Sequence, residues 1–336
     1  MTGMTAKLKN ISKIVLYTGS NTRCDCTCNC LGCFLGDSKT RKASYQGELE
    51  QIHEMLNVLP NLKSVRMYGN PDISVDAHFC NAVAKCLQNK GIELEFFTSG
   101  IGGAKVIETV LDEISPSSVK RVIFSVDTLS IEKLTQMKGT KISLETILEG
   151  IECCNRLNIP FSVLAVIWPM NVDDDWIAYH NFFKSFGARN VIARFGSVEG
   201  TTGNVSHVPE DKVLEIIEKY KSSPIILNKL FINNDEHEGR MFGAEFYDRS
   251  KIKCTDWSLS SADSLYVYLE DGTIKATSIC PYFADLSPNH YVSIHSIETL
   301  EAPFTGDVNE CPIAGRLLGY KPVKSRSICR YYLTSG

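Results

Sequence analysis

Short apolar segments alternate with longer amphipathic segments over about the first 195 residues, and this alternation limits the possible fold more than any other feature. The apolar segments are rich in Val, Ile, Phe and Tyr, which is typical of buried strands. We predict strands at 13–18, 64–68, 94–98, 121–126, 161–168 and 191–195. Helices with apolar residues at three- and four-residue spacing are predicted at 45–57, 76–89, 104–114, 142–157 and 173–186.

Six successive strands joined by helical segments indicate a parallel sheet with right-handed crossovers. Six units are too few for a complete eight-stranded barrel. The sequence therefore predicts an α/β fold, an open and partial (β/α)6 TIM-like barrel.

The pattern changes after Gly200, and from about Lys251 onward short strands are expected. The segment "SLYVYLEDGTIKATSI" has alternating residues on both sides of an Asp-Gly turn, which predicts a hairpin. We place the domain boundary so that residues 1–235 form the barrel core and residues 236–336 form a small α+β extension that contains cysteines.

Composition narrows the functional classes. A net charge of −4 and a pI near 6.0 give no basic field for nucleic acid. The N-terminal segment has no signal-peptide pattern, and no apolar run approaches the roughly 20 residues that span a bilayer. The sequence therefore predicts a cytoplasmic protein. In a reducing compartment its 13 cysteines are expected to be buried thiols or metal ligands rather than disulfides.

Five cysteines lie within "RCDCTCNCLGC", directly after the first predicted strand. Only Cys26, Cys30 and Cys33 have the spacing CxxxCxxC. Three thiolates on one loop can hold three corners of a four-iron, four-sulfur cluster and leave the fourth iron open to a small molecule. A structural zinc site, which normally has four closed ligands, is the alternative.

The CxxxCxxC loop after the first strand of a partial barrel resembles the radical S-adenosylmethionine (SAM) enzymes. The resemblance implies that the cluster cleaves SAM reductively and that the resulting 5′-deoxyadenosyl radical removes a substrate hydrogen. It also implies SAM-binding residues at the carboxyl ends of the other strands, in "MYGNPDIS", "FFTSG", "FSVDT" and "RFG". The residues implied are Phe34, Gly69, Asn70, Pro71, Asp72, Thr98, Ser99, Ser125, Asp127 and Arg194. Among them, Arg194 is expected to neutralise the cofactor carboxylate.

Four further cysteines, Cys254, Cys280, Cys311 and Cys329, lie in the C-terminal region around the predicted hairpin. Their arrangement resembles the twitch and SPASM extensions of radical SAM enzymes and implies one auxiliary iron–sulfur cluster. A zinc site or scattered buried thiols are the alternatives. Cys80, Cys86, Cys153 and Cys154 lie in predicted helices and are expected to be ordinary core thiols.

Extensions of this kind imply an oxidoreductase-type enzyme that modifies a ribosomally made peptide by oxidation, crosslinking or epimerisation. A dehydrogenase or related enzyme acting on a small molecule is the alternative, and an iron–sulfur or zinc scaffold is the alternative without catalysis. The resemblance further implies an external one-electron reductant of the flavodoxin or ferredoxin type. No nucleic acid or membrane partner is expected.

Overall fold

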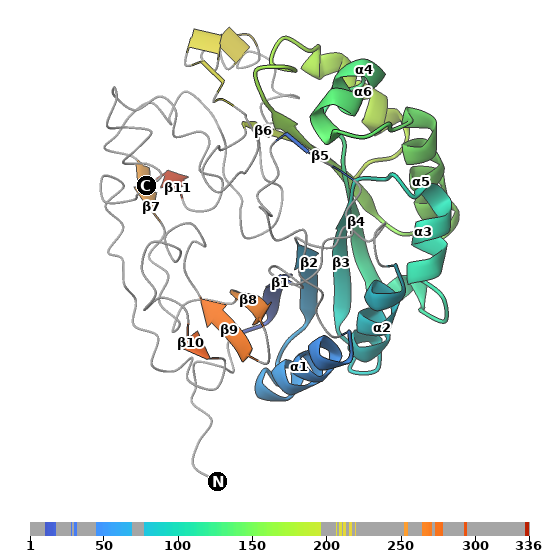
Figure 1. The fold of residues 1–336 in the computed structure, drawn as a ribbon, viewed down its shortest axis with the longest axis vertical. Helices are drawn as coiled ribbons and strands as arrows, with labels where there is room; N and C mark the ends of the chain where they lie inside the picture. Colours follow the sequence, from blue (N-terminus) through green and yellow to red (C-terminus); the bar gives the residue numbers. More distant parts are fainter. Residues whose placement is uncertain are drawn as a thin grey trace.

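The computed structural model describes the elements that build the barrel and parts of the C-terminal region (Figure 1). The described residues are 11–17, 28, 30–31, 45–68, 77–195, 206, 208–209, 211–212, 215–216, 219, 252–254, 264–270, 273–277, 292–293 and 333–335. None of the described helices is long and apolar enough to cross a membrane.

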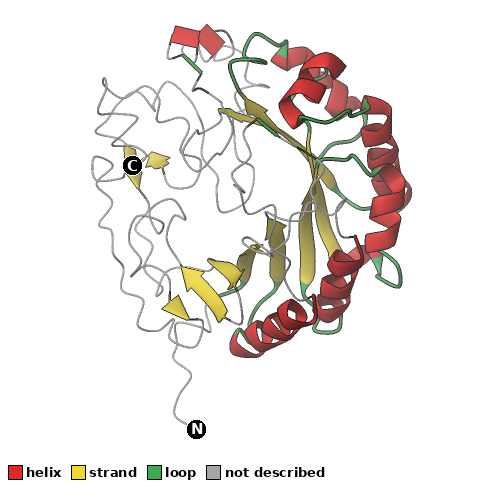
Figure 2. Cartoon of the chain, in the orientation of Figure 1, coloured by secondary structure: helices red, strands yellow, loops and turns green. Residues whose placement is uncertain are grey.

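Six parallel strands form the main sheet in chain order. They are β1 (Lys13–Tyr17), β2 (Ser64–Tyr68), β3 (Glu93–Thr98), β4 (Val119–Ser125), β5 (Phe161–Ile167) and β6 (Asn190–Phe195). The helices are α1 (Tyr45–Val58), α2 (Ala77–Gln88), α3 (Gly103–Val110), α4 (Ile131–Lys138), α5 (Leu144–Arg156) and α6 (Trp176–Ser185), with a 3-10 turn at Pro116–Ser118. These helices cover one face of the curved sheet (Figure 2). The predicted open α/β barrel is therefore confirmed.

Helix α4 is the element that the sequence patterns did not predict. Ser130 caps its first turn by accepting a hydrogen bond from the N–H of Lys133, and Gly139 ends it in the left-handed region at φ 62°. The helix has only eight residues, and of these Leu134 and Met137 form its buried apolar face. A pattern of two turns is too short to stand out by periodicity alone.

The C-terminal hairpin joins the main sheet. Strand β8 (Ser264–Glu270) pairs in parallel with β1, and β9 (Thr273–Thr277) pairs antiparallel with β8, as the predicted hairpin requires. The last strand of this edge is β10 (Val292–Ser293), so the sheet order is β10-β9-β8-β1-β2-β3-β4-β5-β6. Val267, Leu269 and Ile274 belong to the same hydrophobic core as β1. The boundary between residues 235 and 236 stays a prediction, because it lies outside the described residues.

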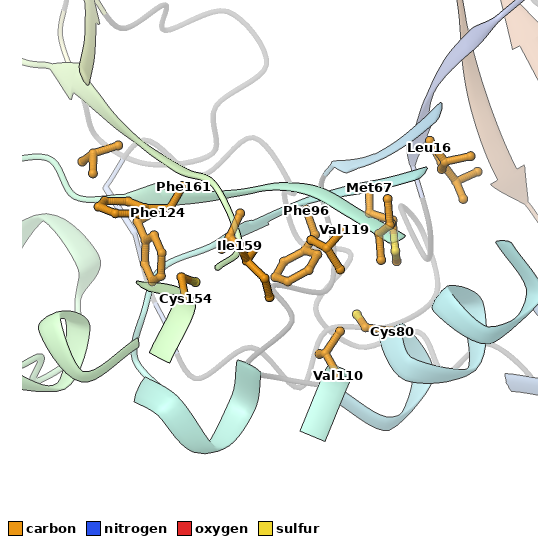
Figure 3. Close-up of a cluster of buried hydrophobic side chains, with 14 of the residues drawn as sticks. Leu16, Met67, Cys80, Phe96, Val110, Val119, Phe124, Cys154, Ile159 and Phe161 are labelled. Carbon is orange, nitrogen blue, oxygen red and sulfur yellow. The ribbon is translucent and has the colours of Figure 1, made fainter. Parts of the chain in front are cut away.

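The hydrophobic core lies between the sheet and the helices (Figure 3). Phe124 and Phe161 meet edge to face on neighbouring strands, with ring centroids 6.1 Å apart. Cys80, Cys153 and Cys154 are fully buried, which confirms them as core thiols. Cys86, by contrast, is half-buried, and its thiol lies 3.3 Å from Nε2 of His53.

The opposite face of the sheet carries side chains in layers, because alternate residues of a strand point to opposite faces. Toward the amino ends, Glu95 contacts the guanidinium groups of Arg66 and Arg121, its register neighbours on either side. We call these three residues the charged floor. One layer further on, the side chains are apolar and form a small cluster of Phe97, Ile123, Leu164 and Ile192.

Candidate functional site

The cysteine loop contacts helix α4. The N–H of Leu31 donates a hydrogen bond to the carbonyl of Met137, at 2.9 Å. Cys28 is 7% exposed and Cys30 is half-buried. The loop follows β1, at the carboxyl edge of the sheet where barrels of this kind place their sites. Of the three predicted ligands of the cluster, Cys26 and Cys33 lie outside the described residues.

Thr98 ends β3 at the same edge and Ser99 follows it, and both are buried. The hydroxyl of Thr98 accepts a hydrogen bond from the N–H of Gly100 at 3.0 Å and so closes the turn. Gly100 has a φ of +77°, and a Cβ there would lie 2.9 Å from Ile147 of α5. The turn therefore needs glycine at this position, and it holds Thr98 and Ser99 firmly at the edge of the sheet.

Ser125 ends β4, and Asp127 follows it as a buried carboxylate. Oδ2 of Asp127 lies 2.7 Å from the ammonium of Lys138, and both side chains are 7% exposed. The same ammonium donates a hydrogen bond to the hydroxyl of Ser125 at 3.1 Å. Oδ1 of Asp127 accepts a hydrogen bond from the N–H of Val166 at 2.9 Å. Both carboxylate oxygens therefore have partners within the protein.

Asn171 fixes the chain around Asp127. It is fully buried, and its side-chain amide donates to the carbonyls of Asp127, at 2.6 Å, and Val166, at 2.9 Å. Its side-chain oxygen accepts from the N–H of Trp168 at 2.7 Å. Tyr179 adds a hydrogen bond from its hydroxyl to the carbonyl of Val126, at 2.5 Å. Burial raises the pKa of Tyr179 well above its ordinary value, and the charge of Asp127 adds to the effect, so its hydroxyl keeps the proton that it donates.

Lys138 is the site residue that sequence reasoning missed. A lysine in the last turn of a helix, next to a capping glycine, is normally solvated. Here the last residue of α4 meets the end of β4, and its ammonium is buried beside Asp127 and Ser125. The one sequence signal that could have found it is its position ten residues after the "FSVDT" segment, which ends at Thr128.

The other predicted cofactor residues are described in part or not at all. The main chain of Arg194 lies in β6 and pairs with Val166, while its side chain is outside the described residues. Phe34, Gly69, Asn70, Pro71 and Asp72 are also outside the described residues. Their roles stay predictions.

In the C-terminal region, Cys254 ends strand β7 (Ile252–Cys254), which pairs antiparallel with β11 (Leu333–Ser335). Cys254 lies opposite Leu333, four residues after Cys329 in the sequence. Cys280, Cys311 and Cys329 themselves lie outside the described residues.

The donor chemistry of the cysteine loop fits an iron–sulfur cluster. Thiolates are the usual ligands of such clusters, and a cluster with cysteine ligands carries negative charge. A buried ammonium beside this loop balances negative charge that would be costly to bury alone. Among the described residues, no group of three or more His, Cys, Asp or Glu side chains could hold a metal elsewhere.

Comparison with known proteins places this arrangement in a superfamily. Residues 21–183 match the family model of the radical SAM superfamily. The matched segment runs from the cysteine loop through α6 and includes Asp127 and Lys138. Residues 21–183 therefore form a radical SAM domain.

Individual relatives are distant. The chain is 24% identical to a GTP 3′,8-cyclase from Campylobacter fetus subsp. fetus (strain 82-40) over 333 residues, which are 95% of this chain and 94% of the cyclase. Its fold is similar to that of Streptococcus suis SuiB bound to S-adenosylmethionine, with a TM-score of 0.56 and 16% identity over 96% of this chain and 74% of SuiB. It is also similar to anSMEcpe with bound AdoMet and Cp18Cys peptide, with a TM-score of 0.57 and 12% identity over 95% of this chain and 88% of that protein.

Proposed function

We propose that the protein is an enzyme that cleaves SAM reductively at a cluster held by Cys26, Cys30 and Cys33. A four-iron cluster there would supply one electron, taken from an external reductant, to the sulfonium of SAM. Cleavage of the C5′–S bond would give methionine and a 5′-deoxyadenosyl radical. The radical would take a hydrogen atom from the substrate. The observation that carries the proposal is the CxxxCxxC loop docked beside the buried Asp127–Lys138 pair, inside a matched radical SAM domain.

The chain's own residues would bind and orient SAM from the carboxyl edge of the sheet. The turn at Thr98 and Ser99 would offer hydroxyl and backbone groups, and Ser125 would offer a hydroxyl beside a buried charge. Arg194, at the end of β6, would neutralise the carboxylate of SAM by a forked contact. The segment 69–72 would present backbone carbonyls to its ammonium.

For the substrate, we propose a ribosomally made peptide, modified by oxidation, crosslinking or epimerisation. The peptide-bound anSMEcpe structure, whose fold this chain resembles along most of its length, supports the proposal. The GTP 3′,8-cyclase, which matches this chain over 94% of its own length, supports the alternative that the substrate is a small molecule. Product analysis after incubation with candidate peptides and with nucleotides would separate these two classes.

We further propose that Cys254, Cys280, Cys311 and Cys329 hold a second cluster. The pairing of β7 with β11 supports it, because it brings Cys254 beside Leu333, close in sequence to Cys329. Reconstituted protein would then contain about eight irons per chain, two four-iron clusters. A count near four in active protein would contradict the auxiliary cluster and leave the first cluster intact.

The central test is SAM cleavage by anaerobically reconstituted protein with dithionite as reductant. The wild type should form 5′-deoxyadenosine. The triple variant Cys26→Ala, Cys30→Ala, Cys33→Ala should form none. Cys24→Ala, which changes a cysteine of the same loop outside the spacing, is the matched control and should retain cleavage. A scaffold without catalysis would give no 5′-deoxyadenosine in any of these proteins.

A further inference from the structure

The charges of the buried pair Asp127 and Lys138 lie at fixed positions beside the cysteine loop. Lys138 is the last residue of α4, and the residue before it, Met137, accepts the hydrogen bond from Leu31 of the loop. Leu31 directly follows Cys30 in the sequence. One backbone hydrogen bond therefore connects the segment that carries the ammonium to the segment that carries a predicted cluster ligand.

The charge of Lys138 depends on its burial and on its carboxylate partner. Burial by itself would lower the pKa of Lys138, but the charge and hydrogen bond of Asp127 raise it, and Cys30 and Cys28 raise it further. The carboxylate of Asp127, whose Oδ2 lies 2.7 Å from Nζ of Lys138, keeps Lys138 a cation in this site. Because Lys138 is 7% exposed, water screens its charge poorly.

Asp127 is held as firmly as its partner. Its two oxygens accept from Val166 and Lys138, and its backbone carbonyl accepts from the buried amide of Asn171. The carboxylate cannot turn away if the ammonium is removed, because Val166 and Asn171 still fix it. Substitution of Lys138 therefore leaves the carboxylate of Asp127 close to its present position.

We propose that the Asp127–Lys138 pair sets the reduction potential of the cluster held by the cysteine loop, with Lys138 raising it and Asp127 lowering it. The proposal rests on the proposed function, because it requires the cluster. One-electron reduction adds negative charge to a cluster. A fixed cation nearby stabilises the reduced state, and a fixed carboxylate disfavours it. Lys138 and Asp127 are in this sense positioning residues, which act on the cluster without ligating it.

The test measures the reduction potential of the cluster in reconstituted holoprotein. Samples are poised at a series of potentials, and the fraction of reduced cluster is read from the electron paramagnetic resonance signal that changes when SAM is added. Lys138→Met should lower the ratio of reduced to oxidised cluster about tenfold at a fixed potential, which equals about 59 mV for a one-electron couple. Asp127→Asn should shift the ratio in the opposite direction. The double variant should lie between the two, and Lys138→Arg should remain close to the wild type.

Lys133→Met is the matched control, since Lys133 lies on the same helix and pairs with Asp174 near the surface. It should leave the potential unchanged. Shifts of the same sign in Lys138→Met and Asp127→Asn, or no shift in either, would overturn the proposal. A fall in SAM affinity at constant potential would also overturn it and make Lys138 a cofactor ligand.

Loss of iron leads to one conclusion in the Lys138→Met variant and to another in the wild type. If Lys138→Met loses its iron, the sign of the Asp127→Asn shift decides alone, because asparagine keeps the size and much of the hydrogen bonding of aspartate. A wild type that binds no iron would contradict the proposed function itself. The potential is measured without substrate, so a substrate that is still unidentified does not affect the outcome.

Discussion

Two buried ionic groups lie on the sheet of this protein, and they are built differently. The charged floor joins Arg66, Glu95 and Arg121, which are direct register neighbours on three adjacent strands. The pair of Asp127 and Lys138 joins a residue just beyond β4 to the last residue of α4, next to the cysteine loop. The apolar layer around Ile123 separates the two levels of the sheet.

The two ionic groups differ in which parts of the fold their contacts connect. In the floor, Glu95 contacts Arg66 of β2 and Lys120 and Arg121 of β4, so its contacts tie strands to each other. At the carboxyl edge, the contacts of Asp127 tie the end of β4 to β5, to α4 and to the turn that holds Asn171. Helix α4 in turn contacts the segment that carries the cysteines, through the hydrogen bond from Leu31 to Met137. We therefore expect changes in the floor to alter folding, and changes at the edge to alter the reaction as well.

The largest expected effect on stability comes from Glu95→Gln. It removes the carboxylate that Arg66, Arg121 and Lys120 contact and leaves buried positive charge without compensation. Loss of one partner of a buried ion pair costs about 3–5 kcal/mol. Urea unfolding followed by circular dichroism measures the loss. A change below about 1 kcal/mol would mean that the floor contributes little to folding.

The pH dependence of stability tests the same carboxylate. Burial alone would raise the pKa of Glu95, but Arg66, Arg121 and Lys120 lower it from 4.5 to about 2. A pKa depressed in the folded state stabilises the fold above the unfolded pKa, and this stabilisation, about 3 kcal/mol, is lost as the pH falls from 4.5 toward 2. The difference in unfolding free energy between wild type and Glu95→Gln should therefore shrink over this range. A difference that stays constant would contradict the depressed pKa.

Asn171→Ala tests the carboxyl edge, where we expect one substitution to lower both the stability of the fold and SAM cleavage. It leaves the carbonyls of Asp127 and Val166 and the N–H of Trp168 without their buried partner. The expected cost is about 2–3 kcal/mol. Since Asn171 also fixes Asp127, SAM cleavage per cluster should fall in protein that is still folded. Full cleavage in folded Asn171→Ala protein would show that the position of Asp127 is unimportant for the reaction.

The smallest effect is expected at an exposed ion pair. Arg156 and Glu108 contact each other on the surface, with side chains 61% and 54% exposed. Such pairs contribute about 0–1 kcal/mol. Glu108→Gln should leave unfolding and SAM cleavage nearly unchanged, so it serves as the reference for the buried variants. If Glu108→Gln lost as much unfolding free energy as Glu95→Gln, burial would not explain why the two ion pairs differ.

Sequence patterns predicted the parts of the fold that depend on local periodicity. All six strands of the barrel, five of its helices and the β8–β9 hairpin lie where the patterns placed them. The attachment of β8 to β1 was not predictable, because pairing between strands about 250 residues apart leaves no local signal.

The same limit applies to the site. Ser125 and Asp127 were predicted at the end of a strand, since strand ends are visible in the sequence. Their partner Lys138 was not, because its burial depends on how the last residue of α4 meets the end of β4. The charged floor was missed for a similar reason: Arg66, Glu95 and Arg121 become neighbours only through the register of three strands.

The most direct test of the division between floor and edge compares SAM cleavage in two proteins at equal folded fraction. Glu95→Gln changes the floor, and the triple variant Cys26→Ala, Cys30→Ala, Cys33→Ala changes the loop at the edge. Anaerobic incubation with dithionite and SAM, with 5′-deoxyadenosine measured per folded chain, should give a nearly wild-type yield for Glu95→Gln and no product for the triple variant. Equal loss in both proteins, or wild-type yield from the triple variant, would contradict the assignment of the chemistry to the cysteine loop.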